Sequence, residues 1–242
     1  MGLGTGITVA LICWFALKPA GQPAPAAEAA ADPPAAVPGL SLAEAARTLT
    51  FAKLAVASYL AYAVRLAIAI HLIPMLSAGG VARTTAVVIG GSYGLWMILG
   101  QIVSGAAMDR FPARFVSALW LAMMAGSLAL LMLPPQPIAL PIVAVALFGI
   151  SMGGMAPTFP YLTSRYFGLR SFGKLFGIIA SLSGLGFATG PLLAGYAFDV
   201  SSSYLPFLAG AIPALLLAAL LILSMGRYPD PADPGSVTTA RV

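Results

Sequence analysis

Charged residues are scarce in this chain. Asp, Glu, Lys and Arg together make up only 8% of its 242 residues, whereas soluble domains contain about 25%. Hydrophobic residues account for 60%, and they form runs longer than the helices or strands of a soluble core require. This balance excludes an ordinary soluble domain and predicts that most of the chain lies in a lipid bilayer.

Cysteine and histidine are almost absent. Cys13 and His71 are the only residues of their kinds, which excludes an internal disulfide and argues against zinc and iron–sulfur sites. Gly149-Ile-Ser151-Met-Gly153 has the spacing of a nucleophile elbow, but that motif follows a strand, and this one lies within an apolar helical run. We therefore predict no metal, no cofactor and no enzymatic activity.

Seven apolar runs divide the chain, and six of them are long enough to cross a membrane as helices. About 20 helical residues at 1.5 Å each span a hydrocarbon core of about 30 Å, and the first run is shorter than this. The sequence predicts an all-α membrane protein, a bundle of six transmembrane helices preceded by a partial helix. The runs cover 2–17, 51–76, 86–108, 115–133, 137–159, 175–198 and 204–225.

The segments outside these runs complete the predicted domain organisation. A partial transmembrane helix at 1–17 is followed by a Pro/Ala-rich linker at 18–50, whose many prolines disfavour a folded core element. Ser41 and Glu44 have the spacing of a capping box, which predicts a short surface helix from 41 to 49. The six-helix bundle then occupies 51–226, and 227–242 form a tail.

The net charge of +5 is spread over the loops and is not gathered in one basic patch, so we do not expect nucleic-acid binding. If successive runs alternate in direction, all twelve Lys and Arg residues except Arg65 and Arg83 fall on one side. Basic loops favour the cytoplasmic side. We predict a multi-pass protein of the cell (inner) membrane, with its linker and carboxy terminus in the cytoplasm.

A weak internal repeat is present. Gly105-Ala-Ala-Met-Asp109 closes the third run on one predicted side, and Gly195-Tyr-Ala-Phe-Asp199 closes the sixth run on the other. An inverted-topology repeat of two helix triplets would have this pattern. Glycines also recur four residues apart, which favours close helix packing in lipid. These glycine pairs are 90/94, 149/153 and 186/190.

The pattern formed by Gly105, Asp109, Arg110 and Arg114 resembles the signature loop of the major facilitator superfamily. In that superfamily the loop lies on the cytoplasmic side, and the resemblance implies that these four residues lock an inner gate. The segments 71–74, 165–173 and 190–199 are similar to the branch of monocarboxylate transporters and oxalate:formate antiporters. The resemblance covers about 41–226 and implies the carboxy-terminal six of twelve helices, with part of the sixth before them.

Arg65 lies in the middle of an apolar run, where a cation costs several kcal/mol unless it faces a cavity or a partner. No acid lies in any run to neutralise it, and Tyr62 lies one helical turn earlier on the same face. A substrate anion is one partner for Arg65. The alternatives are that Arg65 binds backbone carbonyls or extends towards the membrane surface.

Two further polar residues are candidates for the substrate site. The resembled branch often has an arginine in the run 86–108, where this chain has Gln101, whose amide can hydrogen-bond a carboxylate without adding charge. Histidine suits proton coupling near neutral pH, but His71 lies near the outer end of its run and is equally placed for contact with interfacial water. We therefore predict that Arg65, Tyr62, Gln101 and His71 form the substrate site.

These observations predict one half of a secondary transporter, which moves a small, monocarboxylate-like organic anion by alternating access. Transport by such a half requires a second copy in a homodimer or an amino-terminal half-transporter chain, because the substrate site lies between two halves. The alternative interpretation is a membrane protein that does not transport, either an accessory or scaffold protein or a truncated inactive remnant.

Overall fold

The computed structural model describes residues 39–134, 137–226 and 228. The predicted partial helix at 1–17, Cys13, residues 18–38 of the linker and the tail other than Tyr228 lie outside this part of the chain. Within it the regular structure is α-helical, and Gly39 and Gly168 form one isolated antiparallel bridge. The predicted all-α fold is confirmed.

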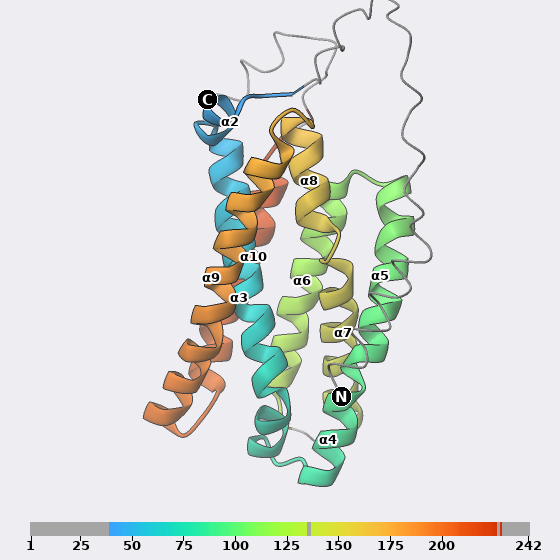
Figure 1. Cartoon of the computed structure of the whole chain (residues 1–242). Coiled ribbons are helices and arrows are strands. Elements are labelled where there is room, and N and C mark those ends of the chain that lie inside the picture. The colour runs from blue at the N-terminus through green and yellow to red at the C-terminus, as the bar shows by residue number, and fades with distance from the viewer. Residues whose placement is uncertain (1–38, 135–136, 227, 229–242) are drawn as a thin grey trace, which may run out of the picture. The chain divides into compact units, whose positions relative to one another are not determined.

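Six helical stretches are long and apolar enough to cross a membrane among the described residues. Four are the single helices α3, α6, α9 and α10, and two are the broken pairs α4–α5 and α7–α8 (Figure 1). The six predicted spans are therefore present. The helices are α2 (Leu42–Ala46), α3 (Leu49–Ala78), α4 (Arg83–Gly91), α5 (Tyr93–Arg110), α6 (Ala113–Leu131), α7 (Ala139–Gly154), α8 (Thr158–Phe167), α9 (Phe172–Ser201) and α10 (Leu205–Leu223).

The predicted capping box begins α2. The Ser41 hydroxyl accepts a hydrogen bond of 3.4 Å from the Glu44 amide, and the Glu44 carboxylate accepts one of 2.9 Å from the Ser41 amide. These bonds satisfy amide donors that have no partner in the first turn of a helix. At the start of α3, the Thr48 side chain accepts from the Phe51 amide in the same way, at 3.1 Å.

The predicted run 137–159 continues eight residues further in the structure, as α8. Pro157 and Pro160 interrupt the apolar pattern, and the polar residues that follow lower the hydropathy. Both prolines lie at the start of α8. Backbone amides in the first turn of a helix have no helical acceptor, so the missing amide proton of proline costs no helical hydrogen bond there. As a result, Tyr161 and Arg165 belong to the same helical stretch as α7.

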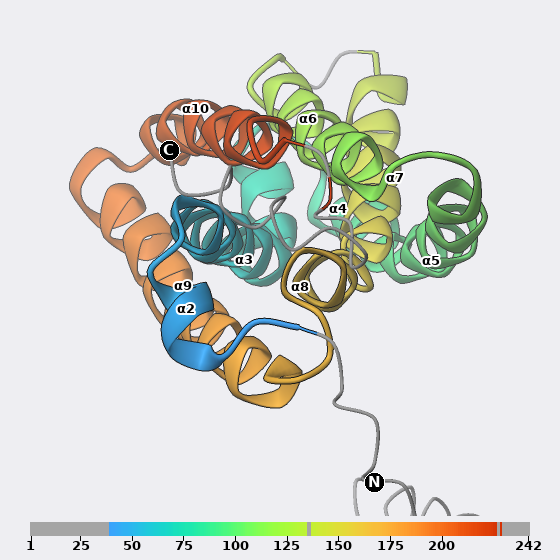
Figure 2. The ribbon, with the colours of Figure 1, turned by 90° about the horizontal axis from the view of Figure 1, so that it is seen from above.

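The helices pack in a pattern with internal symmetry. α3 packs on α9 and α10, α7 packs on α5 and α6, and α6 packs on α10 (Figure 2). Exchanging α3, α5 and α6 with α7, α9 and α10 converts this set of contacts into itself. The first triplet is α3, α5 and α6, and the second is α7, α9 and α10. The two triplets run in opposite directions along the long axis of the bundle, since each begins at the end where the other finishes (Figure 1). The predicted inverted repeat accounts for this packing.

Glycines lie where α9 crosses α3 and where α7 crosses α5, two contacts that the exchange of triplets makes equivalent. A Cβ atom on Gly186 of α9 would lie 2.9 Å from the Ala63 nitrogen of α3, and one on Gly190 would overlap the Ala63 carbonyl group. Gly149 and Gly153 of α7 meet the backbone of α5 as closely. Two of the three predicted glycine pairs therefore allow direct contact between helix backbones.

The third glycine pair is different. A Cβ atom on Gly90 would meet the Ile73 side chain at 2.8 Å, whereas the space beside Gly94 is open. Only one member of this pair lies at a helix contact, so the spacing alone did not identify a crossing.

Basic side chains gather at one end of the helices, drawn uppermost in Figure 1, where α3, α6 and α9 begin and α5, α8 and α10 finish. We call this the basic end. Arg83 begins α4 at the opposite end. This arrangement agrees with the distribution of charge predicted from the sequence. The basic end includes Arg47, Lys53, Arg110, Arg114, Arg165, Arg170 and Lys174.

Candidate functional site

Arg65 lies near the middle of α3 and is partly buried. Its guanidinium carbon is 5.4 Å from the centroid of the Tyr62 ring, which lies one turn earlier on the same helical face. The Nε atom of Arg65 is buried and has no hydrogen-bond partner in the described part of the chain. The site therefore contains a cation with an unused donor, which is costly to bury unless a ligand or another chain satisfies it.

No described carboxylate lies at the depth of Arg65. Glu44 is in α2, Asp109 is the second-last residue of α5, and Asp199 lies two residues before the end of α9. Tyr93, the first residue of α5, is close enough to interact electrostatically with the guanidinium. The neighbours of Arg65 are thus aromatic hydroxyl groups, and in this part of the chain its positive charge is not balanced by an acid.

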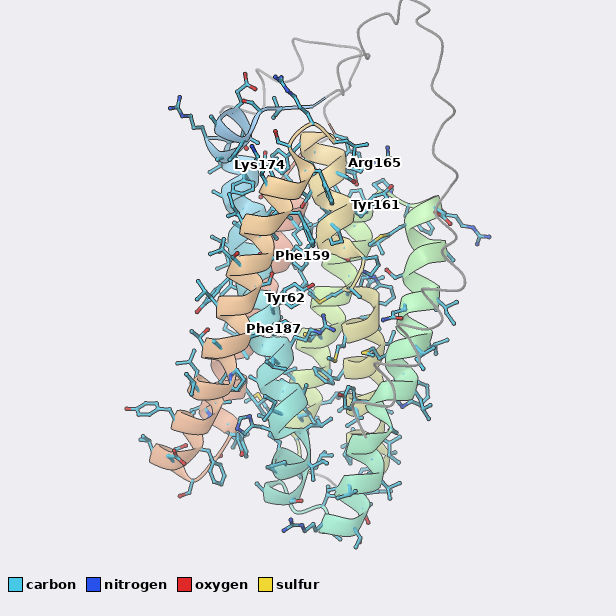
Figure 3. The ribbon with its side chains drawn as sticks, in the orientation of Figure 1. Tyr62, Phe159, Tyr161, Arg165, Lys174 and Phe187 are labelled. Carbon is cyan, nitrogen blue, oxygen red and sulfur yellow. The ribbon has the colours of Figure 1, made fainter. Side chains whose placement is uncertain are left out.

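Two phenylalanine rings complete the surroundings of Tyr62. The Phe187 ring of α9 contacts it edge-on at a centroid distance of 5.0 Å, and the Phe159 ring of α8 contacts it at 5.4 Å. We call Tyr62, Phe159 and Phe187 the aromatic cluster, which joins three helices midway along the bundle (Figure 3). Sequence analysis missed both phenylalanines, because they lie about 100 residues or more from Tyr62 and belong to no local motif.

Neither of the other two predicted substrate residues hydrogen-bonds Arg65 in the described part of the chain. Gln101 is on α5 with an exposed side chain, and in the described part of the chain it makes no hydrogen bond to Arg65, Tyr62 or His71. His71 is six residues after Arg65, about 9 Å along the helix axis. Its Nδ1 atom lies 3.0 Å from the carbonyl oxygen of Ala67, so Nδ1 carries a proton and donates. Of the four predicted substrate residues, Arg65 and Tyr62 are the pair that the described contacts bring together.

Three of the predicted gate residues are exposed near the end of α5. Gly105, Asp109 and Arg110 face away from the packed helices, and no ion pair joins Asp109 to Arg110 or Arg114 in the described residues. Arg114 lies in the first turn of α6, where its Nη1 atom donates a hydrogen bond to the carbonyl oxygen of Gly226. The structure thus connects this motif to the segment that follows α10.

Other donors bind the same segment. The Tyr166 hydroxyl of α8 donates to the Gly226 carbonyl at 2.9 Å, and the Lys53 ammonium of α3 donates to the Ser224 carbonyl at 3.1 Å. With Arg114, these side chains satisfy carbonyls beyond the last turn of α10, which lack helical partners. We call this group of hydrogen bonds the carbonyl clasp. It ties four helices together at the basic end.

A cavity among the described residues lies elsewhere. It is at the end opposite the basic end, between the last turns of α3 and α6 and the first turns of α7 and α10, with Leu76, Leu131, Leu140 and Tyr204 in its wall. Its lining is mainly apolar and includes none of the predicted site residues. The cavity therefore adds nothing to the site around Arg65.

The six membrane-length apolar helices of the described chain define a multi-pass helical membrane protein. Residues 51–241 match the model of the Major Facilitator Superfamily, and the chain belongs to this superfamily. The resemblance found in the loop from Gly105 to Arg114 is thereby confirmed at the level of the family.

Two curated relatives match parts of the chain. It is 26% identical over 154 residues to monocarboxylate transporter 9 of Rattus norvegicus, covering 59% of this chain and 30% of that protein. It is 31% identical over 139 residues to the multidrug efflux pump Tap of Mycolicibacterium fortuitum, covering 52% of this chain and 33% of the pump. The matches thus span about a third of the length of each relative.

Proposed function

We propose that this chain is half of a secondary transporter for a small organic anion, and that Arg65 binds the anion with Tyr62 beside it. The observation that carries this proposal is the buried, unpartnered Nε atom of Arg65 in the middle of α3. A carboxylate would neutralise the cation and accept from its donors. The names of the two relatives indicate different substrates, a monocarboxylate for one and drugs for the other. The positive charge of Arg65, which no described acid balances, favours an anionic substrate for this chain.

The chemistry of the site follows from the guanidinium group. Its planar fork of N–H donors matches the two oxygens of a carboxylate, and such bidentate, charge-assisted bonds are stronger than neutral ones. Arg65 lies midway along a membrane-length helix, where the dielectric constant is lower than at the membrane surface, so the attraction between the two charges is less screened. The Tyr62 hydroxyl and the exposed amide of Gln101 are further donors for the same anion when a second half closes the site.

Alternating access supplies the route of transport. Two six-helix halves rock about a site near the middle of the membrane, and each conformation exposes the site to one side. We place the basic end in the cytoplasm, because basic loops are retained on that side. Gly105, Asp109, Arg110 and Arg114 then lie at the inner gate. The second half is another copy of this chain or an amino-terminal half-transporter chain.

The test is counterflow uptake of labelled benzoate and acetate into liposomes that contain the purified chain. We expect Arg65→Gln to reduce uptake by about 10- to 100-fold, because it removes a charge-assisted bond. Arg83→Gln is the matched control, since Arg83 is an exposed arginine at the first position of α4. Uptake by Arg65→Gln equal to that of the unmodified chain would sink the proposal.

Anion binding, measured as a shift of the thermal unfolding midpoint, separates the remaining outcomes. Binding that depends on Arg65 without counterflow would show that the chain needs a partner half. Absence of both binding and counterflow in correctly inserted protein would contradict the proposal and leave an accessory protein or an inactive remnant.

A further inference from the structure

The described spans place a single basic residue in their interior. Lys53 is in the first two turns of α3, Arg114 is in the first turn of α6, and Arg165 and Lys174 lie within a turn of helix ends at the basic end. Arg65 is the one that lies at mid-depth. One guanidinium neutralises one carboxylate, and a second anionic group on the same ligand would be buried without a partner in this half.

Aromatic side chains lie beside this cation. Tyr62 contacts Phe187 and Phe159. Tyr93 of α5, a helix that does not carry the aromatic cluster, is close enough to interact electrostatically with the cation. Phe159 is only 1% exposed and packs on the Tyr62 ring as part of the buried core. Tyr62 and Phe187 are partly exposed, so a ligand held at Arg65 can reach both rings. A ligand at this site therefore contacts one positive charge, that of Arg65, and the aromatic rings of Tyr62 and Phe187.

We propose that the Arg65 site selects a monoanion that carries an aromatic or similarly flat apolar group. The carboxylate binds Arg65, and the apolar group packs on Tyr62 and Phe187. The proposal rests on the proposed function, because it assumes that Arg65 binds the transported anion. Aromatic contact adds to the gain from burying apolar area, so an aryl carboxylate binds more tightly than a short aliphatic one. Dicarboxylates are disfavoured by their second charge.

The experiment measures apparent dissociation constants for benzoate, acetate and phthalate from thermal unfolding of the purified full chain in detergent. The variants are Arg65→Gln and Phe187→Leu. The matched control is Phe176→Leu, because Phe176 is a partly exposed phenylalanine on the same helix and stacks on Phe172 away from the site. Shifts seen with Arg65→Gln give the background from partitioning into detergent.

We expect benzoate to bind about tenfold more tightly than acetate, and phthalate more weakly than benzoate. Phe187→Leu should reduce the benzoate-to-acetate preference to about threefold or less, and Phe176→Leu should leave it unchanged. If Arg65→Gln loses all binding but Phe187→Leu keeps the preference, the selectivity inference fails and the anion site stands. Equal binding of benzoate and acetate, or of phthalate and benzoate, overturns it as well. Binding that does not depend on Arg65, or no binding at all, overturns the proposed function too.

Discussion

The hydroxyl group of Tyr166 on α8 donates a hydrogen bond of 2.9 Å to the carbonyl oxygen of Gly226, just beyond α10. Arg114, in the loop motif that resembles the signature of the superfamily, donates to the same oxygen. The two donors come from different helix triplets and meet on the segment after the last helix. The arginine of this loop therefore binds a backbone carbonyl, and among the described residues it forms no ion pair with the acid of the motif, Asp109.

Removing donors from the carbonyl clasp should destabilise the basic end in a graded way. Tyr166→Phe removes a neutral donor and should lower the free energy of unfolding by about 1 kcal/mol, and Arg114→Gln removes a charged one and should cost about 2 kcal/mol. Because both bind one oxygen, the double variant should deviate from the sum of the single effects. Thermal unfolding of the purified variants measures this.

The control for the clasp is Tyr196→Phe, since Tyr196 is 69% exposed on α9 and has no hydrogen-bond partner among the described residues. We expect this change to leave the unfolding midpoint in place. Equal shifts for Tyr166→Phe and Tyr196→Phe would mean that the clasp contributes nothing to stability.

Glycine is required where α9 crosses α3. In Gly190→Ala the new methyl group would overlap the Ala63 carbonyl, so the helices must move apart, at a cost of about 1–3 kcal/mol. Gly184→Ala on the same helix faces open space and should be neutral or slightly stabilising, since alanine favours helix. Thermal stability of the two variants in detergent should differ clearly, and similar midpoints would argue against the close crossing.

An unpaired cation should make the site less stable than a neutral one. In the absence of an anion, Arg65→Gln should leave the unfolding free energy unchanged or raise it by about 1–2 kcal/mol, because it relieves an uncompensated buried charge. The measurement is thermal unfolding in an anion-poor buffer. A marked loss of stability would show instead that Arg65 holds the bundle together through backbone carbonyls, which is the structural role left open by the sequence.

Local spacing determined several features before any tertiary contact was known. The capping box of Ser41 and Glu44 and the pairing of Arg65 with Tyr62 each involve residues three apart, and helix geometry brings such residues together. The spans followed from apolar runs of sufficient length. α8 was partly missed because Pro157 and Pro160 interrupt the apolar pattern without ending the span.

Contacts between distant segments were decided by the tertiary structure. Nothing near Tyr62 in the chain indicates that Phe187 and Phe159 pack on its ring, since their helices meet only when α8 and α9 fold against α3. For the same reason the motif at Arg114 did not reveal its acceptor, the Gly226 carbonyl. The sequence by itself determined which segments cross the bilayer and which cation is buried there, because hydropathy and charge act residue by residue. The groups that surround that cation depend on how the helices pack.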